Sequence, residues 1–339
     1  MITEKLYLDT DREESVKKTA EILKNGGIVA LPTETVYGLA ASALDKNAIK
    51  KVFEAKGRPQ DNPLIVHINS IEMLKKVAKD IPKRAFLCAE KFWPGPFTMV
   101  LKSSGYVCSA VSAGLDTVAV RMPKDPVMSD VIARAEIPLA APSANVSGSP
   151  SPVSAEHVIN DLYGKIDAVV MGDRCSVGVE STVVLIEKDS AKLLRPGAVT
   201  LEMLKEILPD ITVDKAILEE YKDGEKVASP GMKYKHYSPS AELYLIEGES
   251  KDFVSYVNKM NDGCALCFTE EEELIKVKTY PYGSINDQKG MAYEIFEILR
   301  RLDKEKIRKG YVHAPSKDGV GLAVYNRLVR ACAHRVIKL

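Results

Sequence analysis

IVALPTETVYGL, residues 28–39, is the stretch that decides the fold of this chain. Its first four residues form an apolar run typical of a buried strand, and they follow an amphipathic helical pattern at residues 13–24 that ends at Gly26 and Gly27. Two threonines and a glutamate come soon after this run. Polar side chains at the end of a buried strand lie where open α/β sheets bind ligands. The stretch therefore predicts an α/β fold with a ligand site at this strand end.

The same alternation of strands and helices continues through the first two hundred residues. A helical run at residues 46–56 stops at Gly57, and apolar runs with strand character recur after it. These strand-like runs lie at residues 63–68, 98–101, 117–122, 137–142, 167–171 and 181–186.

The length and the loop composition predict two domains. At about 150 residues per domain, 339 residues suffice for two cores. The sequence KDGEKVASPGMKYKHYSPSAE is rich in Gly, Pro, Ser and Lys and lacks apolar periodicity, which is typical of a connecting segment. A second α/β pattern follows it. We therefore expect a catalytic domain at 1–210, a linker at 211–239 that folds over the active site, and a smaller domain at 240–339.

Composition and charge exclude several classes of protein. The chain is 45% hydrophobic and 28% charged, which is ordinary for a globular protein, and its 47 basic residues equal its 47 acidic ones. Net neutrality argues against a stable complex with nucleic acid or an anionic membrane. No run approaches the roughly 20 apolar residues that span a bilayer, and the six scattered cysteines fit reduced thiols. We expect a cytoplasmic protein without membrane contact.

Cations and hydroxyl groups gather around the strand ends. Lys56 falls in the last turn of the 46–56 run, with Arg58 just beyond, where cations alone would only complement a helix C-terminus for about 0.3–1 kcal/mol. Other polar residues share such positions: His67, Thr117, Arg121, Ser143, Asn145, Ser181 and Arg195. Arginine forks combined with hydroxyl groups suit triphosphate recognition. No GxxxxGK[ST] or GxGxxG motif occurs, so the phosphate site must be of another kind.

Several motifs together carry a family resemblance. PTETVYGL, KxRPxxxPLIVH, WPGPFT, VAVRMP, APSANxSG, and STVV with LLRPGA follow in order and resemble the YrdC-like threonylcarbamoyl-AMP synthases. SPGMKYKHYSP and GxGxAxxxRLxRA resemble the long form of that family. The resemblance implies a twisted, open YrdC-like α/β sheet with a deep cationic cavity, followed by a smaller Rossmann-like three-layer domain. It also implies the reaction of ATP, L-threonine and bicarbonate to threonylcarbamoyl-AMP and pyrophosphate, for N6-threonylcarbamoyladenosine in tRNA.

The resemblance also implies the site residues. The KxR and SxN signatures give a catalytic set of Lys56, Arg58, Ser143 and Asn145. The implied threonine set is Thr35, His67, Arg121, Ala141 through its backbone, and Ser181. The implied ATP set is Arg58, Asn62, Thr117, Ser143, Ser151, Arg195, His236 and Tyr237. Glu34 and Glu180 are weaker candidates, as polar residues that would orient other groups of the site.

The same reading sets the cofactor and the partners. We expect Mg2+ to arrive with ATP, held by phosphates and water without a metal cage made by the protein. The substrates would be ATP, L-threonine and bicarbonate or CO2, and the product would pass to the downstream tRNA threonylcarbamoyl transferase machinery. Two alternatives stay open. One is a carbamoyl-adenylate-forming domain of hydrogenase maturation, and the other is an RNA-binding ribosome-maturation module.

Overall fold

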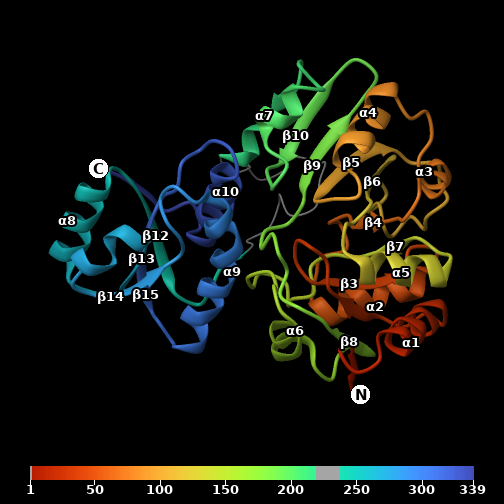
Figure 1. Cartoon of the computed structure of the whole chain (residues 1–339), viewed down its shortest axis with the longest axis horizontal. Helices are drawn as coiled ribbons and strands as arrows, with labels where there is room; N and C mark the ends of the chain where they lie inside the picture. The colour runs from red at the N-terminus through yellow and green to blue at the C-terminus, as the bar shows by residue number, and fades with distance from the viewer. Residues whose placement is uncertain (1, 219–236) are drawn as a thin grey trace.

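The computed structural model describes residues 2–218 and 237–339, which form two α/β units built on separate sheets. Figure 1 shows the units side by side, with α9 (Gln288–Lys304) and α10 (Gly321–Ala331) of the second unit facing the first. No helix in these two ranges is long and apolar enough to cross a membrane.

The first unit holds a mixed sheet of eleven strands in the order β1-β8-β2-β3-β7-β4-β6-β5-β9-β10-β11. Its strands are β1 (Glu4–Tyr7), β2 (Val29–Leu31), β3 (Gly38–Ser42), β4 (Ile65–His67), β5 (Phe97–Lys102), β6 (Thr117–Arg121), β7 (Leu139–Ala140), β8 (Ala168–Met171), β9 (Thr182–Ile186), β10 (Ala191–Arg195) and β11 (Thr212–Val213). Its helices are α1 (Arg12–Lys24), α2 (Lys46–Lys56), α3 (Ile71–Val77), α4 (Lys83–Phe92), α5 (Pro126–Ala135), α6 (Ala155–Leu162), α7 (Leu201–Lys205) and the 3-10 turn η1 (Lys215–Ile217).

Local sequence explains where α2 begins and ends, and the last residue of this helix is the predicted site residue Lys56, with Arg58 just beyond its end. The Asp45 side chain accepts a hydrogen bond from the Asn47 N–H and caps the helix N-terminus. Gly57 adopts the left-handed conformation that ends the helix, with φ of 60°. Between these caps Ile49, Val52 and Phe53 are buried on one face.

The second unit is a three-layer sandwich around a parallel sheet of order β14-β13-β15-β12-β16. Its remaining elements are β12 (Glu242–Glu247), α8 (Ser250–Met260), β13 (Cys264–Cys267), the 3-10 turn η2 (Thr269–Leu274), β14 (Lys278–Pro281), β15 (Lys309–His313) and β16 (Val336–Lys338). Helix α8 packs on one face of the sheet, and α9 and α10 cover the other. Cys264 and Cys267 are free thiols that point to opposite faces of β13, as the strand pattern predicts.

The two units pack closely along α9. Gly178 of the first unit adopts φ of +85°, and a Cβ there would lie 2.3 Å from the Ala292 carbonyl oxygen. Arg174 lies over the Tyr293 ring, 3.8 Å from its centroid, and donates to the Tyr293 carbonyl at 2.8 Å. A continuous hydrophobic cluster runs from one unit into the other. The helices of the second unit therefore form part of the surroundings of the first unit's sheet.

The expected α/β fold, with a large twisted sheet and a second Rossmann-like sheet, is confirmed. The structure adds short strands that the patterns do not predict, namely β1, β3, β10, β11, β14 and β16. The expected strand at residues 137–142 is reduced to Leu139–Ala140. Residues 211–218 pack with the first sheet through β11 and η1, and residues 219–236 lie outside the described part of the chain.

Candidate active site

A cavity of the first unit draws its wall from segments that are far apart in the sequence. It receives the turn after β2, the ends of β4 and β6, the loop after β7, the residues before β9 and the end of β10. The predicted residues on its wall are Thr35, Arg58, His67, Arg121, Ala141, Ser143, Asn145, Ser151, Ser181, Arg195 and Tyr237. The sheet therefore brings together residues from all three predicted sets.

The register of the strands brings the polar residues at the centre of this wall side by side. Strand β4 pairs with β6 through His67 and Arg121, and β5 pairs with β6 through Thr98 and Arg121. The Thr98 hydroxyl in turn lies 2.8 Å from the Ser181 hydroxyl. Four polar side chains from adjacent strands thus meet at one level of the sheet.

The turn after β2 is held by its own hydroxyl groups. Thr33 Oγ1 accepts from the backbone N–H of Thr35 at 3.1 Å and of Val36 at 3.2 Å, and it donates to the Val36 carbonyl at 2.6 Å. Thr33 Oγ1 also lies 2.9 Å from Thr35 Oγ1. Because the Thr33 proton goes to Val36, the Thr35 hydroxyl donates to Thr33. Thr35 therefore offers oxygen lone pairs to its other neighbours.

Arg121 binds three groups around this turn. Its Nη1 donates to Thr35 Oγ1 at 2.8 Å, and its Nε donates to the Gly95 carbonyl at 3.2 Å. Its Nη2 forms an ion pair with Glu34 Oε1 at 2.8 Å, although the two atoms lack hydrogen-bond alignment. Burial opposes ionisation of Glu34, but the Arg121 charge and the Lys124 N–H outweigh it and lower the pKa of the carboxyl group.

His67 is held in its neutral form. Its side chain is buried, and burial followed by the nearby Arg121 charge lowers its pKa to about 3. At neutral pH its ring therefore has one donor and one acceptor nitrogen.

This titration gives a test of the His67 environment. Above about pH 3 the folded state keeps His67 neutral, whereas the unfolded state takes up a proton below about pH 6.5. Stability is therefore lost as the pH falls from 6.5 towards 3. Lowering the pH from 7 to 5 should reduce the unfolding free energy of the parent more than that of His67→Gln, by about 2 kcal/mol. Urea denaturation of both proteins at the two pH values measures this difference. Equal losses in the two proteins would contradict the low pKa.

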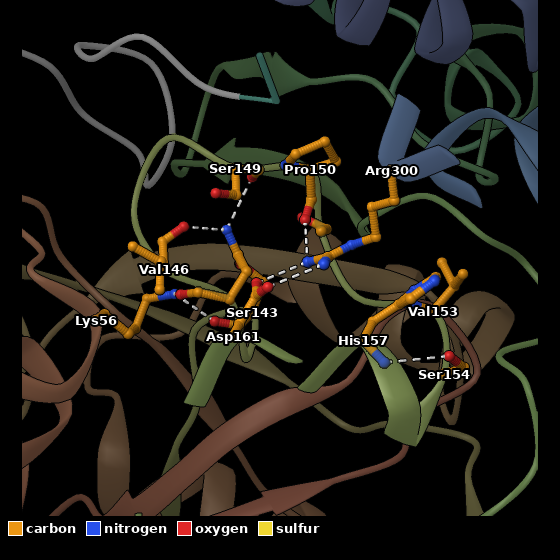
Figure 2. Close-up of polar contacts among 12 residues, drawn as sticks. Lys56, Ser143, Val146, Ser149, Pro150, Val153, Ser154, His157, Asp161 and Arg300 are labelled. Carbon is orange, nitrogen blue, oxygen red and sulfur yellow. Dashed lines mark hydrogen bonds and ion pairs between the residues drawn. The ribbon is translucent and has the colours of Figure 1, made fainter. Parts of the chain in front are cut away.

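Lys56 lies beneath the wall and holds the loop that follows β7. Its Nζ donates to the Ser143 carbonyl at 2.5 Å and to the Asn145 carbonyl at 2.6 Å (Figure 2). The Asn145 amide donates to the carbonyls of Val146 at 2.8 Å and Ser149 at 2.9 Å. Burial, with the Arg58 charge, lowers the pKa of Lys56 well below its usual value. These contacts identify Lys56 as a positioning residue for the 143–149 loop.

Arg195 also binds the residue before β9. Its Nε donates to the Ser181 carbonyl at 3.0 Å, and its Nη2 donates to the Ser181 hydroxyl at 3.2 Å. Arg195 and Ser181, which the sequence assigns to ATP and to threonine respectively, are therefore direct neighbours.

The remaining predicted residues lie elsewhere. Asn62 is buried, and its carbonyl accepts from Arg58 Nε at 3.4 Å. Thr117 lies at the opposite end of β6 from Arg121, about 13 Å along the strand, and lines a separate hollow with Lys102. Its assignment to ATP stays a prediction. His236 lies outside the described residues.

Three buried polar atoms on the cavity wall have no hydrogen-bond partner among the described residues. They are Arg121 Nη2, His67 Nδ1 and Asn145 Oδ1. Buried polar groups are almost always hydrogen-bonded, to protein, to water or to a ligand. Their gathering on one wall indicates a site for a polar ligand. Within the same described ranges, no group of three or more His, Cys, Asp or Glu is placed to hold a metal ion.

Comparison with known families assigns both parts of the chain. Residues 21–197, more than half of the chain, match the Sua5, YciO and YrdC family model, which is described as telomere recombination. Residues 199–333 match the model of the threonylcarbamoyl-AMP synthase C-terminal domain. The chain belongs to the threonylcarbamoyl-AMP synthase family.

Individual members of this synthase family are similar over the whole length. The threonylcarbamoyl-AMP synthase of Pyrococcus abyssi is 42% identical over 336 residues, which is 96% of each chain. That of Bacillus subtilis is 39% identical over 349 residues, and the match covers 100% of both chains. The crystal structure of P. abyssi Sua5 complexed with L-threonine superposes with a TM-score of 0.89 at 39% identity and covers 100% of both chains.

Sequence reasoning misses two arginines of this synthase chain that lie beside the cavity. Arg327 of α10 and Arg300 of α9 both reach the first unit, where they contact Glu180 and Pro150 respectively. Arg327 has a signal in the sequence, because it interrupts the apolar run GLAVYNRLV, where a buried cation needs a partner. Arg300 has no such signal, because it lies in the charged stretch LRRLDK.

Proposed function

We propose that this chain is a threonylcarbamoyl-AMP synthase that uses L-threonine, bicarbonate or CO2, and ATP. The observation that carries the proposal is the group of buried atoms on the cavity wall without a hydrogen bond within the described ranges, Arg121 Nη2, His67 Nδ1 and Asn145 Oδ1, which offers donors and acceptors to an amino acid. Arg58 and Arg195 on the same wall supply charge that matches phosphate oxygens. Family membership at 42% identity supports the same reaction.

The reaction needs two bond-forming steps. The uncharged amine of threonine attacks bicarbonate or CO2 and forms a carbamate, with loss of water when bicarbonate is used and release of the amine proton when CO2 is used. A carbamate oxygen then attacks the α-phosphorus of ATP, and pyrophosphate leaves. The chemistry needs no nucleophile from the protein, so catalysis comes from positioning and from charge stabilisation.

The cavity geometry suggests a role for each group. Arg121 Nη2 would bind the threonine carboxylate, because this donor has no aligned partner among the described residues. The Thr35 Oγ1 lone pair that Arg121 does not use would accept from the amine. His67, with a pKa of about 3, is a poor base and would act by hydrogen bonding. Mg2+ would arrive with ATP, bound by phosphate oxygens and water, and would neutralise phosphate charge.

We also propose that the connecting segment contributes to this cavity. Tyr237, which belongs to this segment and is the first described residue after position 236, is buried, lines the cavity and packs against Phe296 of α9 with ring centroids 5.3 Å apart. The product would leave for the tRNA threonylcarbamoyl transferase machinery, which places the protein in the cytoplasm and requires no stable nucleic-acid complex.

Pyrophosphate release tests the reaction directly. We expect release with ATP, Mg2+, L-threonine and bicarbonate together, and a fall to background when any one of them is left out. The adenylate product should be detected by mass spectrometry in the complete mixture. Pyrophosphate release with ATP, Mg2+ and a carbamoyl donor such as carbamoyl phosphate, in place of threonine and bicarbonate, would favour a carbamoyl-adenylate step instead. Salt-sensitive RNA binding without pyrophosphate release would favour the RNA-binding alternative.

A further inference from the structure

Arg300 of the second unit binds the backbone of the cavity wall. Its Nη2 donates to the Pro150 carbonyl at 2.6 Å. The same guanidinium forms a two-pronged ion pair with Asp161 of α6, with Nη1 to Oδ1 at 3.0 Å and Nη2 to Oδ2 at 2.8 Å. Figure 2 shows Arg300 reaching Pro150 and Asp161 together, beside the loop that carries Ser149. Because Asp161 fixes the guanidinium, the donor to Pro150 is held in place.

Arg327 of the second unit binds the other side of this wall. Its side chain is completely buried, and its Nε donates to Glu180 Oε2 at 2.9 Å. Its Nη2 donates to the Glu180 carbonyl at 3.3 Å, and its Nη1 donates to the Pro196 carbonyl at 2.6 Å. The guanidinium thus links the residues before β9 to those after β10.

Glu180 connects Arg327 to Ser151, because a different oxygen of its carboxylate contacts each residue. Its Oε1 lies 2.5 Å from Ser151 Oγ. Burial opposes ionisation of Glu180, but the charges of Arg327 and Arg195 prevail and lower the pKa of the carboxyl group. A carboxylate only accepts hydrogen bonds, so the Ser151 hydroxyl donates to it. The Ser151 oxygen, which lines the cavity, is therefore left to act there as a hydrogen-bond acceptor.

We propose that Arg300 and Arg327 are positioning residues for the ATP part of the active site. The proposal rests on the proposed function. Neither arginine lines the cavity, but Pro150 and Ser151 are consecutive in the chain, and each is fixed by a different helix of the second unit, Ser151 through Glu180. The second unit thereby sets the backbone position and the hydroxyl direction of one wall. In the described part of the chain, neither Arg300 nor Arg327 forms a hydrogen bond with Arg121 or Thr35.

The test compares Arg300→Gln and Arg327→Gln with a matched control. The control is Arg174→Gln, because Arg174 also joins the two units, through the Tyr293 carbonyl and Glu294, and among the described residues it has no hydrogen bond or ion pair with the 149–151 loop. MgATP binding should weaken about tenfold in the two test variants, which is the loss expected for one charged hydrogen bond. Threonine binding should stay within about twofold of the parent, and the control should keep both affinities. Calorimetric titration with each substrate measures this.

A double variant keeps the test decisive if Arg327→Gln does not fold. Arg327→Gln leaves the buried Glu180 carboxylate without its main cation, so the double variant Glu180→Gln with Arg327→Gln removes that charge as well. Thermal unfolding is measured for every variant. Parental MgATP affinity in both Arg300→Gln and the folded double variant would overturn the proposal, as would equal losses for ATP and threonine.

Direct binding separates this proposal from the reaction itself. A parent protein that binds MgATP but releases no pyrophosphate with threonine and bicarbonate contradicts the proposed function, and the titrations still decide on the arginines. A parent protein that does not bind MgATP contradicts both.

Discussion

Replacing Arg121 with alanine is expected to weaken L-threonine binding about a hundredfold, while MgATP binding stays within about threefold of the parent. Arg121 is buried, and its Nη2, which pairs with Glu34 without hydrogen-bond alignment, lies at the site proposed for the carboxylate. Its removal also frees the Thr35 hydroxyl and leaves Glu34 without its cation. Breaking a buried ion pair from one side costs about 3–5 kcal/mol, so the melting temperature should fall as well.

The matched variant for this experiment is Arg58→Ala. Arg58 lines the same cavity on the segment before β4, and its Nη2 donates to the Pro63 carbonyl at 3.2 Å. We expect this variant to lose MgATP affinity and to keep threonine affinity. Arg195→Ala is a less selective probe, because Arg195 binds Ser181 and its loss should disturb both subsites. Calorimetry with each substrate decides, and equal losses in Arg121→Ala and Arg58→Ala would contradict separate subsites.

The sequence predicts the strands that have a long apolar run and misses several short ones, including β10, in which Lys192 interrupts the apolar residues. Val29–Leu31 and Ile65–His67 follow strong apolar runs. Strand β3, GLAAS, has one large apolar residue, Leu39, among small ones, and both residues of β11 are exposed, so neither strand has a recognisable apolar pattern. Both strands form because a neighbouring strand supplies the pairing.

The site is predictable to the extent that it lies at strand ends. His67 and Arg121 each come at the end of an apolar strand, and parallel pairing of β4 with β6 brings them together. The same reasoning does not separate the two ends of β6, so Thr117 is grouped with Arg121 although it lies in another hollow. The Arg327 contact with Glu180 joins residues 147 positions apart. Only the packing of the two units creates it.

Lys56→Met is expected to lower the unfolding free energy by about 2–5 kcal/mol and to reduce turnover about a hundredfold. Methionine keeps most of the length and apolar volume of the side chain, but it leaves the carbonyls of Ser143 and Asn145 without their donor. Each unsatisfied buried acceptor costs about 1–3 kcal/mol. Turnover falls because the 143–149 loop, which supplies Ser143, Asn145 and Ser149 to the cavity wall, loses its support.

Lys51→Met on the same helix is the control for Lys56→Met. Lys51 also donates to one backbone carbonyl, that of Gly26 at 2.7 Å, but it is exposed, so water replaces the lost bond. We expect this variant to keep parental stability and turnover in urea denaturation and pyrophosphate assays. If Lys56→Met instead kept parental stability and lost turnover, Lys56 would act on the ligand itself, because a supporting role requires both quantities to fall together. If Lys56→Met kept both parental stability and parental turnover, the two hydrogen bonds to the carbonyls would not stabilise the 143–149 loop. Another group would then have to hold the loop.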